Sequence, residues 1–396
     1  MKEEAVHERE VVAEVLESLR KRRRFLHIIV GARQVGKTTA ALQIAEHWRG
    51  VVIRASADEP LPPGPEWIRT HWERATSRRR ESPLLILDEI QKVTGWSETV
   101  KSLWDAEQSA RLPLAVLLLG SSALLVQKGL SESLAGRFLL FRCPHWGYPE
   151  VHAAFRTDLD RWLFFGGYPG SYSLTADESS WSAYIRDSLI ETVLARDVLQ
   201  LQTVAKPALL RHLFLLAASL PAQIVSYNKM LGQLVDAGNT TTLAHYLHLL
   251  GSAFLLTGLE KFRGGQAAKR GSSPKLILWN NALVSAVVGR RFREARQDPS
   301  WWGRIVENAV GACLLNSLQG LPWEVLYWRE GHLEVDYIVR SPRRLLAIEV
   351  KSSRPKASLG LAAFCSRWPE TKPLVVGQGG IPLEEFFSAD LPRLLE

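Results

Sequence analysis

One short glycine-rich segment constrains the fold of this chain more than any other feature. Residues 31–38 read Gly-Ala-Arg-Gln-Val-Gly-Lys-Thr, which fits the pattern G-x-x-x-x-G-K-[ST]. An apolar run at 27–30 precedes the segment and a helical pattern at 38–48 follows it, which is the context that this pattern requires. Glycines let backbone N–H groups surround a phosphate, and the start of the helix adds its dipole. The segment therefore predicts a P-loop that binds ATP or GTP.

A second apolar run ends in two acids that we expect at the same site. Asp88 and Glu89 follow Leu84–Leu87, and carboxylates at the end of a buried parallel strand lie where open α/β sheets bind ligands. We expect Lys37 to reach the β- and γ-phosphates, and Thr38 and Asp88 to hold Mg²⁺. Glu89 would orient or deprotonate the attacking water. The predicted cofactors are ATP and Mg²⁺, and the predicted nucleotide-binding residues are Gly31, Ala32, Arg33, Gln34, Val35, Gly36, Lys37, Thr38, Thr39 and Asp88.

Apolar runs and helical patterns alternate through residues 25–144, after a helical pattern within residues 1–24. The runs are apolar throughout, which is typical of strands in a parallel sheet that is covered on both faces. The sequence therefore predicts an α/β fold with a doubly wound parallel sheet in residues 1–144. The expected strands are 25–30, 51–54, 83–87, 114–119 and 138–143.

Three more segments follow this α/β domain. Residues 145–203 lose the strand pattern and predict a small helical domain, with a long helix at 179–201. Residues 204–280 carry three helical patterns and then two apolar runs, an order that is typical of a winged helix. Residues 281–396 predict a second, smaller α/β unit. Its expected elements are a helix at 301–318, strands at 324–328, 335–340 and 345–350, a helix at 359–365 and a strand at 374–376; the winged-helix elements are expected at 208–219, 227–236, 241–250, 254–262 and 275–279.

Positive charge is concentrated in one stretch of the chain. The formal net charge is +8, and residues 260–304 hold ten Lys and Arg against three Asp and Glu. Such a stretch suits a polyanion, because each phosphate that it neutralises releases counterions. The other interpretation is a solvated surface in an arginine-rich protein.

The sequence also excludes two protein classes. Its three cysteines lie far apart and form no CxxC motif, which excludes a disulfide scaffold. The apolar stretch 112–126 is interrupted by Pro113 and Gly120 and is shorter than the roughly 20 residues that a membrane span needs. We therefore expect a cytoplasmic protein with no membrane partner.

Polar residues beside two later strands extend the nucleotide site. Ser121 and Ser122 follow the run 114–119, where a short polar group can touch the γ-phosphate or the lytic water, or simply form a turn. Arg137 directly precedes the run 138–143. It could form a salt bridge at the edge of the core, or reach the phosphate of a neighbouring subunit.

Together these residues resemble the AAA+ ATPases, with Walker A at 31–38, Walker B at 84–89, sensor 1 at Ser121 or Ser122 and the arginine finger at Arg137. More narrowly, the chain resembles a prokaryotic group in which an AAA+ ATPase is fused to a carboxy-terminal domain of unknown function. The resemblance implies a helical lid at 145–203 and assembly into a ring or another homo-oligomer, with a hexamer favoured. Arg186 and Arg196 are the candidates for sensor 2. The motifs that carry the narrower resemblance are residues 31–39, 88–93, 120–123, 133–138, 166–169, 334–338 and 348–351.

A second set of charged residues lies in the last segment. Glu307 is on a predicted helix, Asp336 on one strand, and Glu349 and Lys351 on the same face of another. Carboxylates and a lysine on adjacent strands can hold Mg²⁺ and activate water for phosphodiester cleavage. The arrangement resembles the PD-(D/E)XK nucleases. The alternative is a scaffold, because an E-x-K pattern is common on half-exposed strands.

The winged-helix segment carries a mixed signal. Its third helix, the usual reader of the major groove, holds His245 and His248 but no Lys or Arg. The basic loop with Lys261, Arg263, Lys269 and Arg270 could instead follow phosphates without reading sequence. The resulting prediction is an ATPase that hydrolyses ATP at subunit interfaces and acts on DNA. The alternative is a regulatory switch, in which the winged helix contacts a protein and the last domain is inert.

Overall fold

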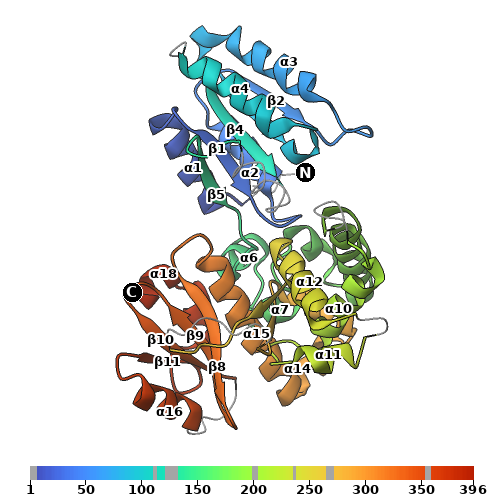
Figure 1. Ribbon diagram of the computed structural model, residues 1–396, viewed down its shortest axis with the longest axis vertical. Coiled ribbons are helices and arrows are strands. Elements are labelled where there is room, and N and C mark those ends of the chain that lie inside the picture. The colour runs from blue at the N-terminus through green and yellow to red at the C-terminus, as the bar shows by residue number, and fades with distance from the viewer. Residues whose placement is uncertain are drawn as a thin grey trace. The chain divides into compact units, whose positions relative to one another are not determined.

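The computed structural model describes residues 7–109, 114–120, 133–198, 204–234, 238–264, 272–352 and 358–396. The chain divides into two compact units, Met1–Pro144 and His145–Glu396 (Figure 1). No helix within the described ranges is long and apolar enough to cross a membrane.

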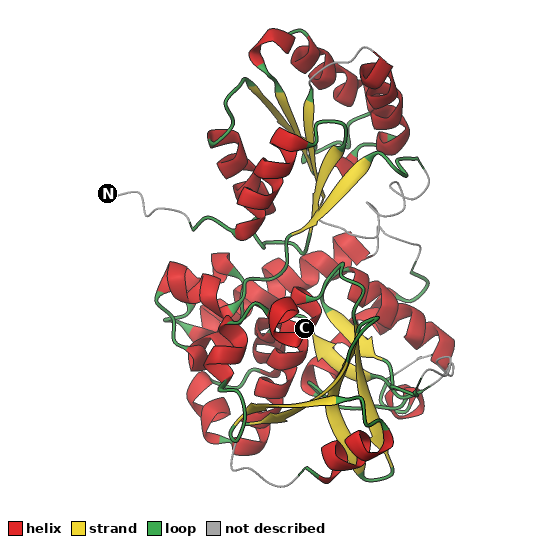
Figure 2. Cartoon of the chain, turned by 90° about the vertical axis from the view of Figure 1, so that its left-hand side faces the viewer, coloured by secondary structure: helices red, strands yellow, loops and turns green. Residues whose placement is uncertain are grey.

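The first unit is built on a five-stranded parallel sheet with the order β2-β3-β4-β1-β5. Every residue of β1, β3 and β4 is buried, as expected for parallel strands with helices on both faces, and Figure 2 shows helices on both sides of the sheet. The predicted α/β fold with its parallel sheet is therefore confirmed. The strands are β1 (Leu26–Val30), β2 (Val52–Ser56), β3 (Leu84–Asp88), β4 (Ala115–Gly120) and β5 (Phe138–Arg142).

Apolar residues at helical spacing fix the helices on this sheet. α1 (Glu10–Lys21) buries Val11, Val12, Val15, Leu16 and Leu19, the stripe that its sequence pattern predicts. The others are α2 (Lys37–Glu46), α3 (Pro65–Thr76) and α4 (Trp96–Ser109). Trp72 of α3 and Trp104 of α4 lie in one hydrophobic core with the β3 and β4 strands.

The second unit begins with helices. They are α6 (Tyr148–Phe155), α7 (Leu159–Phe165) and α8 (Glu178–Ala183), and α8 continues into the π-helical segments Tyr184–Ile190 and Val193–Val198. The helix predicted at 179–201 is therefore present from 178 to 198, interrupted by widened turns. Residues 199–203 lie outside the described residues.

Three helices and two antiparallel strands follow in the predicted order: α10 (Pro207–Ser219), α11 (Tyr227–Leu231), α12 (Thr240–Ser252), β6 (Leu256–Leu259) and β7 (Lys275–Leu278). α11 is shorter than the predicted 227–236, and it ends where Gly232 disfavours helix. β6 is shorter than the predicted 254–262 at both ends. Phe254 has a left-handed backbone with φ 58°, and Lys261 forms an isolated bridge with Tyr327 outside the β6–β7 pair. Ile224, between α10 and α11, forms an isolated antiparallel bridge with Lys275 of β7.

The chain ends in a four-stranded mixed sheet with the order β11-β10-β9-β8. β10 is parallel to β11 and antiparallel to β9, which is antiparallel to β8. The strands are β8 (Glu324–Glu330), β9 (Leu333–Arg340), β10 (Leu345–Lys351) and β11 (Lys372–Gly377); the helices of this region are α13 (Asn281–Val288), α14 (Phe292–Gln297), α15 (Pro299–Ser317), α16 (Leu359–Arg367), α17 (Leu383–Ser388) and α18 (Leu391–Leu395).

Candidate functional site

The P-loop turns from β1 into α2 through backbone conformations that only certain residues tolerate. Gly36 has a left-handed backbone with φ 91° at the start of α2, and Gln34 is also left-handed with φ 59°. A Cβ atom at Gly31 would lie 2.1 Å from the carbonyl oxygen of Cys143, so only glycine fits there. The loop is therefore held in one compact shape by β5 and its continuation.

Lys37 is buried at the first position of α2. Its Nζ donates hydrogen bonds to the carbonyl oxygens of Gly31 (3.1 Å) and Ala32 (2.5 Å). The ammonium thus lies inside the loop that the motif predicts to surround the phosphates.

Thr38 and Asp88 face each other across the site. The Thr38 hydroxyl donates a 2.8 Å hydrogen bond to Oδ2 of Asp88, the last residue of β3. Burial raises the pKa of Asp88, and the hydrogen bond from Thr38 opposes that rise. A hydroxyl and a carboxylate oxygen at this separation form the donor set that Mg²⁺ uses beside a nucleotide, so these residues fit the predicted ion.

Glu89 directly follows β3 in a strained backbone conformation with φ 54°. Its N–H donates to Oδ1 of Asp88 (2.8 Å), and its Oε2 accepts a 2.6 Å hydrogen bond from the Gln91 amide. Lys92 lies 4.0 Å from the same carboxylate oxygen. Gln91 therefore orients the predicted general base, a contact that the sequence analysis missed.

Arg9 is a second residue that the sequence analysis missed at this site. Its buried Nη1 donates to the carbonyl oxygens of Val35 (3.0 Å) and Pro144 (3.0 Å), and it lies 2.9 Å from Sγ of Cys143. Arg9 thereby links the P-loop to the chain beyond β5. It lies in a run of charged residues, and nothing in that run distinguishes it.

Arg137, the predicted arginine finger, pairs with an acid of its own chain. Its Nε and Nη2 donate to the two oxygens of Asp105 at 2.8 and 3.1 Å, and 33% of its side chain is exposed. This contact corresponds to the salt bridge that is one of the two predicted roles of Arg137. Ser121 and Ser122 lie outside the described residues, as does the side chain of Arg196.

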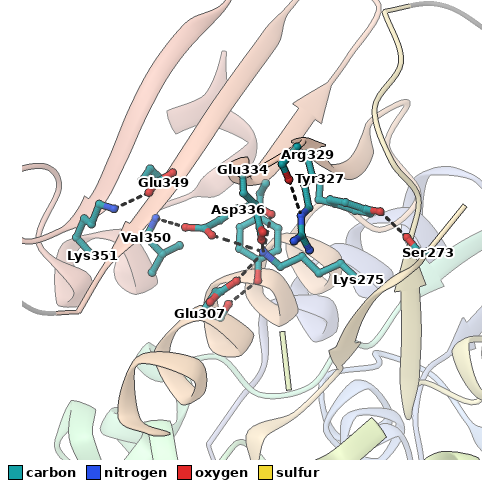
Figure 3. Close-up of polar contacts among 12 residues, drawn as sticks. Ser273, Lys275, Glu307, Tyr327, Arg329, Glu334, Asp336, Glu349, Val350 and Lys351 are labelled. Carbon is teal, nitrogen blue, oxygen red and sulfur yellow. Dashed lines mark hydrogen bonds and ion pairs between the residues drawn. The ribbon is translucent and has the colours of Figure 1, made fainter. Parts of the chain in front are cut away.

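The charged residues predicted in the last segment lie in two groups in the second unit: Asp336 lies with Glu307, whereas Glu349 pairs with Lys351 (Figure 3). Asp336 lies in β9 and Glu349 in β10, and these strands are neighbours with Tyr337 opposite Ile348. Oδ2 of Asp336 accepts a 2.8 Å hydrogen bond from the N–H of Val350. The expectation that the two carboxylates belong to adjacent strands is confirmed.

Lys351 follows Glu349 by two residues in β10, and side chains two residues apart in a strand lie on the same face. Its Nζ is 2.5 Å from Oε1 of Glu349, so both side chains lie on one face of β10. Burial and the charge of Asp336 raise the pKa of Glu349, whereas Lys351 opposes that rise.

An unpredicted lysine occupies the other side of Asp336. Nζ of Lys275, from β7, lies 2.6 Å from Oε1 of Glu307 on α15 and 3.6 Å from Oδ1 of Asp336. It also lies 3.7 Å from Oε1 of Glu334. Burial lowers the pKa of Lys275, but the charges of these three acids outweigh burial and raise it above the ordinary lysine value. We refer to Lys275, Glu307, Glu334 and Asp336 as the lysine–carboxylate cluster.

The basic stretch 260–304 has part of its charge compensated. Arg290 pairs with Asp298 and Arg296 with Asp160, both at 2.7 Å, whereas the side chains of Arg291 and Arg293 are exposed. His245 and His248 lie on the exposed side of α12. Lys269 and Arg270 lie outside the described residues.

Comparison with protein families divides the chain into three parts. Residues 23–152 match a family model described as an AAA domain. Residues 156–294 and 302–385 match two models that are described as domains of unknown function, DUF8612 and DUF4143. The amino-terminal unit is therefore a P-loop domain of the AAA type.

Two relatives span most of the chain. An uncharacterized protein of Mycobacterium tuberculosis is 26% identical over 348 residues, which is 85% of this chain and 74% of the relative. An uncharacterized protein of Haemophilus influenzae is 21% identical over 357 residues, 84% of each chain.

Two solved structures are similar at low identity. The Walker-type ATPase Paby2304 of Pyrococcus abyssi is 15% identical, with a TM-score of 0.48, over 72% of this chain and 97% of that chain. The RuvB Holliday junction branch migration motor of Thermotoga maritima is 16% identical, with a TM-score of 0.35, over 66% and 92%.

Proposed function

We propose that this chain, whose amino-terminal domain is of the AAA type, hydrolyses ATP and uses the hydrolysis to act on DNA. The observation that carries the ATPase proposal is the hydrogen bond between Thr38 and Asp88, with Glu89 next in the chain. This contact brings the hydroxyl of the P-loop and the carboxylate of β3 to one point, beside the ammonium of Lys37.

Each residue has a definite task in the proposed reaction. Backbone N–H groups of the P-loop and Lys37 bind and orient the phosphates. Thr38 and Asp88 would hold Mg²⁺, which when bound neutralises negative charge on the phosphates. Glu89 accepts a proton from the water that attacks the γ-phosphorus. The bond from the γ-phosphorus to the bridging oxygen breaks, and ADP and phosphate leave.

Assembly into a homo-oligomer, with a hexamer favoured, belongs to the same proposal. In such an assembly Arg137 would leave Asp105 and reach the γ-phosphate bound by the neighbouring subunit. The exposure of Arg137 at the surface of its unit supports this role, because a fully buried arginine would be unable to change partners. Ser121 or Ser122 serves as sensor 1 in this proposal.

The proposal that the protein acts on DNA rests on the positive charge of one stretch of the chain. Exposed Arg291 and Arg293, together with Lys261 and Arg263, belong to the basic stretch 260–304. The proposal includes a winged helix at 204–280 that contacts the phosphate backbone. The order of helices and strands and the bridge from Ile224 to Lys275 support that assignment.

The test is the ATPase rate of the full chain, measured without DNA and with duplex, single-stranded or branched DNA. We expect DNA to stimulate hydrolysis, and the stimulation to fall as salt rises, because phosphate contacts release counterions. The same rate with and without every DNA would contradict the DNA proposal but leave the ATPase proposal standing.

Cleavage of DNA by Glu307, Asp336, Glu349 and Lys351 remains a prediction. Carboxylate oxygens of Glu307, Glu334 and Asp336 lie within 4.8 Å of one another, close enough to share one divalent ion. If such an ion were bound, it would activate the attacking water, and Lys351 would stabilise charge at the phosphate. The ammonium of Lys275, however, already lies among these oxygens.

That position of Lys275 favours a second candidate function. In it, ATP controls a protein-binding surface on the 204–280 segment, and the carboxy-terminal domain performs no chemistry. Two measurements separate the candidates: stimulation of the ATPase by DNA, and Mg²⁺- or Mn²⁺-dependent cutting of DNA by the full chain with Asp336→Ala as the control. Either result favours the motor. An ATPase that neither cuts DNA nor responds to it favours the switch.

A further inference from the structure

Lys275 is a buried cation in an otherwise apolar strand. β7 reads Lys-Leu-Ile-Leu, and all four residues are buried, with no exposed part of the Lys275 side chain. Burying an ammonium is costly unless it is paired and hydrogen-bonded. The position of this lysine therefore requires partners of opposite charge.

The partners come from two other elements of the unit. Nζ of Lys275 lies 2.6 Å from a carboxylate oxygen of Glu307 and 3.6–3.7 Å from oxygens of Asp336 and Glu334. It also donates a 3.0 Å hydrogen bond to the carbonyl oxygen of Asp336 and lies 4.8 Å from the centre of the Tyr337 ring. Figure 3 shows the ammonium directed between these side chains. Such surroundings are those of a bound cation.

We propose that Lys275 is the resident cation of the lysine–carboxylate cluster and keeps divalent metal ions out of it. An ion shared by all three carboxylates would lie about 2.0–2.6 Å from each oxygen, in the space that the ammonium fills. Repulsion between the two cations adds to this steric exclusion. While Lys275 remains in place, Asp336 is unable to share a divalent ion with Glu307 and Glu334.

Hydrogen bonds to other segments fix the position of β7, and with it that of Lys275. Its carboxylate partners lie on α15 and β9, whereas β7 is held on its other side by the segment before α11. The N–H groups of Ala222 and Val225 donate to the carbonyl oxygens of Leu276 (2.8 Å) and Pro274 (3.0 Å). β7 is also tied to α15, because the Asn308 side chain accepts a hydrogen bond from the N–H of Leu278 and donates one to its carbonyl oxygen, both at 3.0 Å. The backbone around β7 therefore helps to hold the ammonium of Lys275 in the cluster.

The first experiment compares Mn²⁺ binding by the full chain without nucleotide, read from the electron paramagnetic resonance signal of free Mn²⁺. The variants are Lys275→Met, which removes the charge and keeps an unbranched apolar side chain, and the matched control Lys229→Met at an exposed lysine of α11. We expect Lys275→Met to gain one Mn²⁺ site that binds at least about tenfold more tightly than any site of the parent in this unit. Adding Asp336→Asn to Lys275→Met should abolish the gained site, and Lys229→Met should match the parent.

The same Mn²⁺-binding experiment has an outcome that contradicts the proposal. If the parent protein binds one Mn²⁺ that is lost in Glu307→Gln or Asp336→Asn, and Lys275→Met binds it no more tightly, the proposal is overturned. Neither readout involves ATP, so the proposal can fail while the proposed ATPase function holds, and the reverse.

A second experiment requires no variant and covers the case in which Lys275→Met does not fold. The folded parent protein is treated with a lysine-acetylating reagent, with and without millimolar Mn²⁺, and modified lysines are located by mass spectrometry. We expect Lys229 to be modified and Lys275 to stay protected under both conditions, because its ammonium is buried and paired. Acetylation of Lys275 that appears only with Mn²⁺ would show that metal displaces it, and would overturn the proposal.

Discussion

Each of the two units has a buried lysine at a polar site, but the two lysines have different partners. Lys37 donates to the neutral carbonyl oxygens of Gly31 and Ala32, inside a loop of backbone N–H groups. Lys275 lies among three carboxylates from α15 and β9. The first arrangement directs the ammonium into the loop that the motif predicts to surround phosphates, whereas the second surrounds the ammonium with acids of the protein itself. A buried lysine alone therefore does not identify a ligand site; the charge of its neighbours decides.

The largest effect should come from removing Lys37, the lysine of the P-loop. We expect Lys37→Ala to lose measurable ATP binding, because the charge on the β- and γ-phosphates loses its counterpart. Isothermal titration with a non-hydrolysable ATP analogue measures this. The control is Lys21→Ala, at an exposed lysine of α1 that pairs with Glu17. If Lys37→Ala bound ATP as tightly as the control, Lys37 would not be the residue that binds the phosphates, and its contrast with Lys275 would not hold.

Arg137 is a third cation whose role can be tested. It serves either the nucleotide of a neighbouring subunit or only Asp105 of its own chain. If it serves a neighbouring subunit, Arg137→Ala should lower the rate of ATP hydrolysis by about 10³–10⁵-fold, the usual contribution of an arginine finger. Mixing Arg137→Ala with Lys37→Ala subunits should then restore part of the activity at mixed interfaces. The partner variant Asp105→Asn should keep hydrolysis, because it removes only the resting contact. No rescue in confirmed mixed oligomers, or an equal loss in Asp105→Asn, would assign Arg137 to its own chain as a structural residue.

Glu89→Gln should separate ATP binding from ATP hydrolysis at the nucleotide site. The amide keeps the shape of the side chain but is unable to accept a proton from water, so we expect hydrolysis to fall by about 10²–10⁴-fold while ATP binding persists. Phosphate release measures the first quantity and titration the second. Glu81→Gln, at an exposed acid in the same unit, is the control. Hydrolysis at the parental rate in Glu89→Gln would show that another residue acts as the base.

The two lysine sites also differ in how far the sequence alone could predict them. The P-loop and the buried strands of the first unit follow from patterns of neighbouring residues, and so does the pairing of Glu349 with Lys351 across one strand face. Lys275 could not be assigned a role in this way, because its partners Glu307 and Asp336 are brought to it by the tertiary fold. Its one sequence signal was a single lysine in an apolar strand.

Arg9 and Gln91 show a related limit. Each makes specific hydrogen bonds at the nucleotide site, yet neither residue belongs to the chemical pattern of Lys37, Thr38, Asp88 and Glu89. Residues that orient others are found from geometry, since many side chains could have supplied the same hydrogen bond.

The smallest expected effects concern the stability of the lysine–carboxylate cluster. The loss of free energy of unfolding should decrease as the distance of the substituted acid from the Lys275 ammonium increases. Breaking a buried ion pair typically costs about 3–5 kcal/mol when it leaves a charge uncompensated, so Lys275→Met should lower the free energy of unfolding most. Glu307→Gln should follow, because its oxygen is 2.6 Å from the ammonium, and Glu334→Gln at 3.7 Å should have the smallest effect. The loss of Glu334 also relieves repulsion among the three acids, which reduces its cost further. Urea unfolding of the full chain, followed through the tryptophans, measures the order. If Glu334→Gln destabilised the protein more than Glu307→Gln, the ammonium would not be bound mainly by Glu307, and the cluster would need another account.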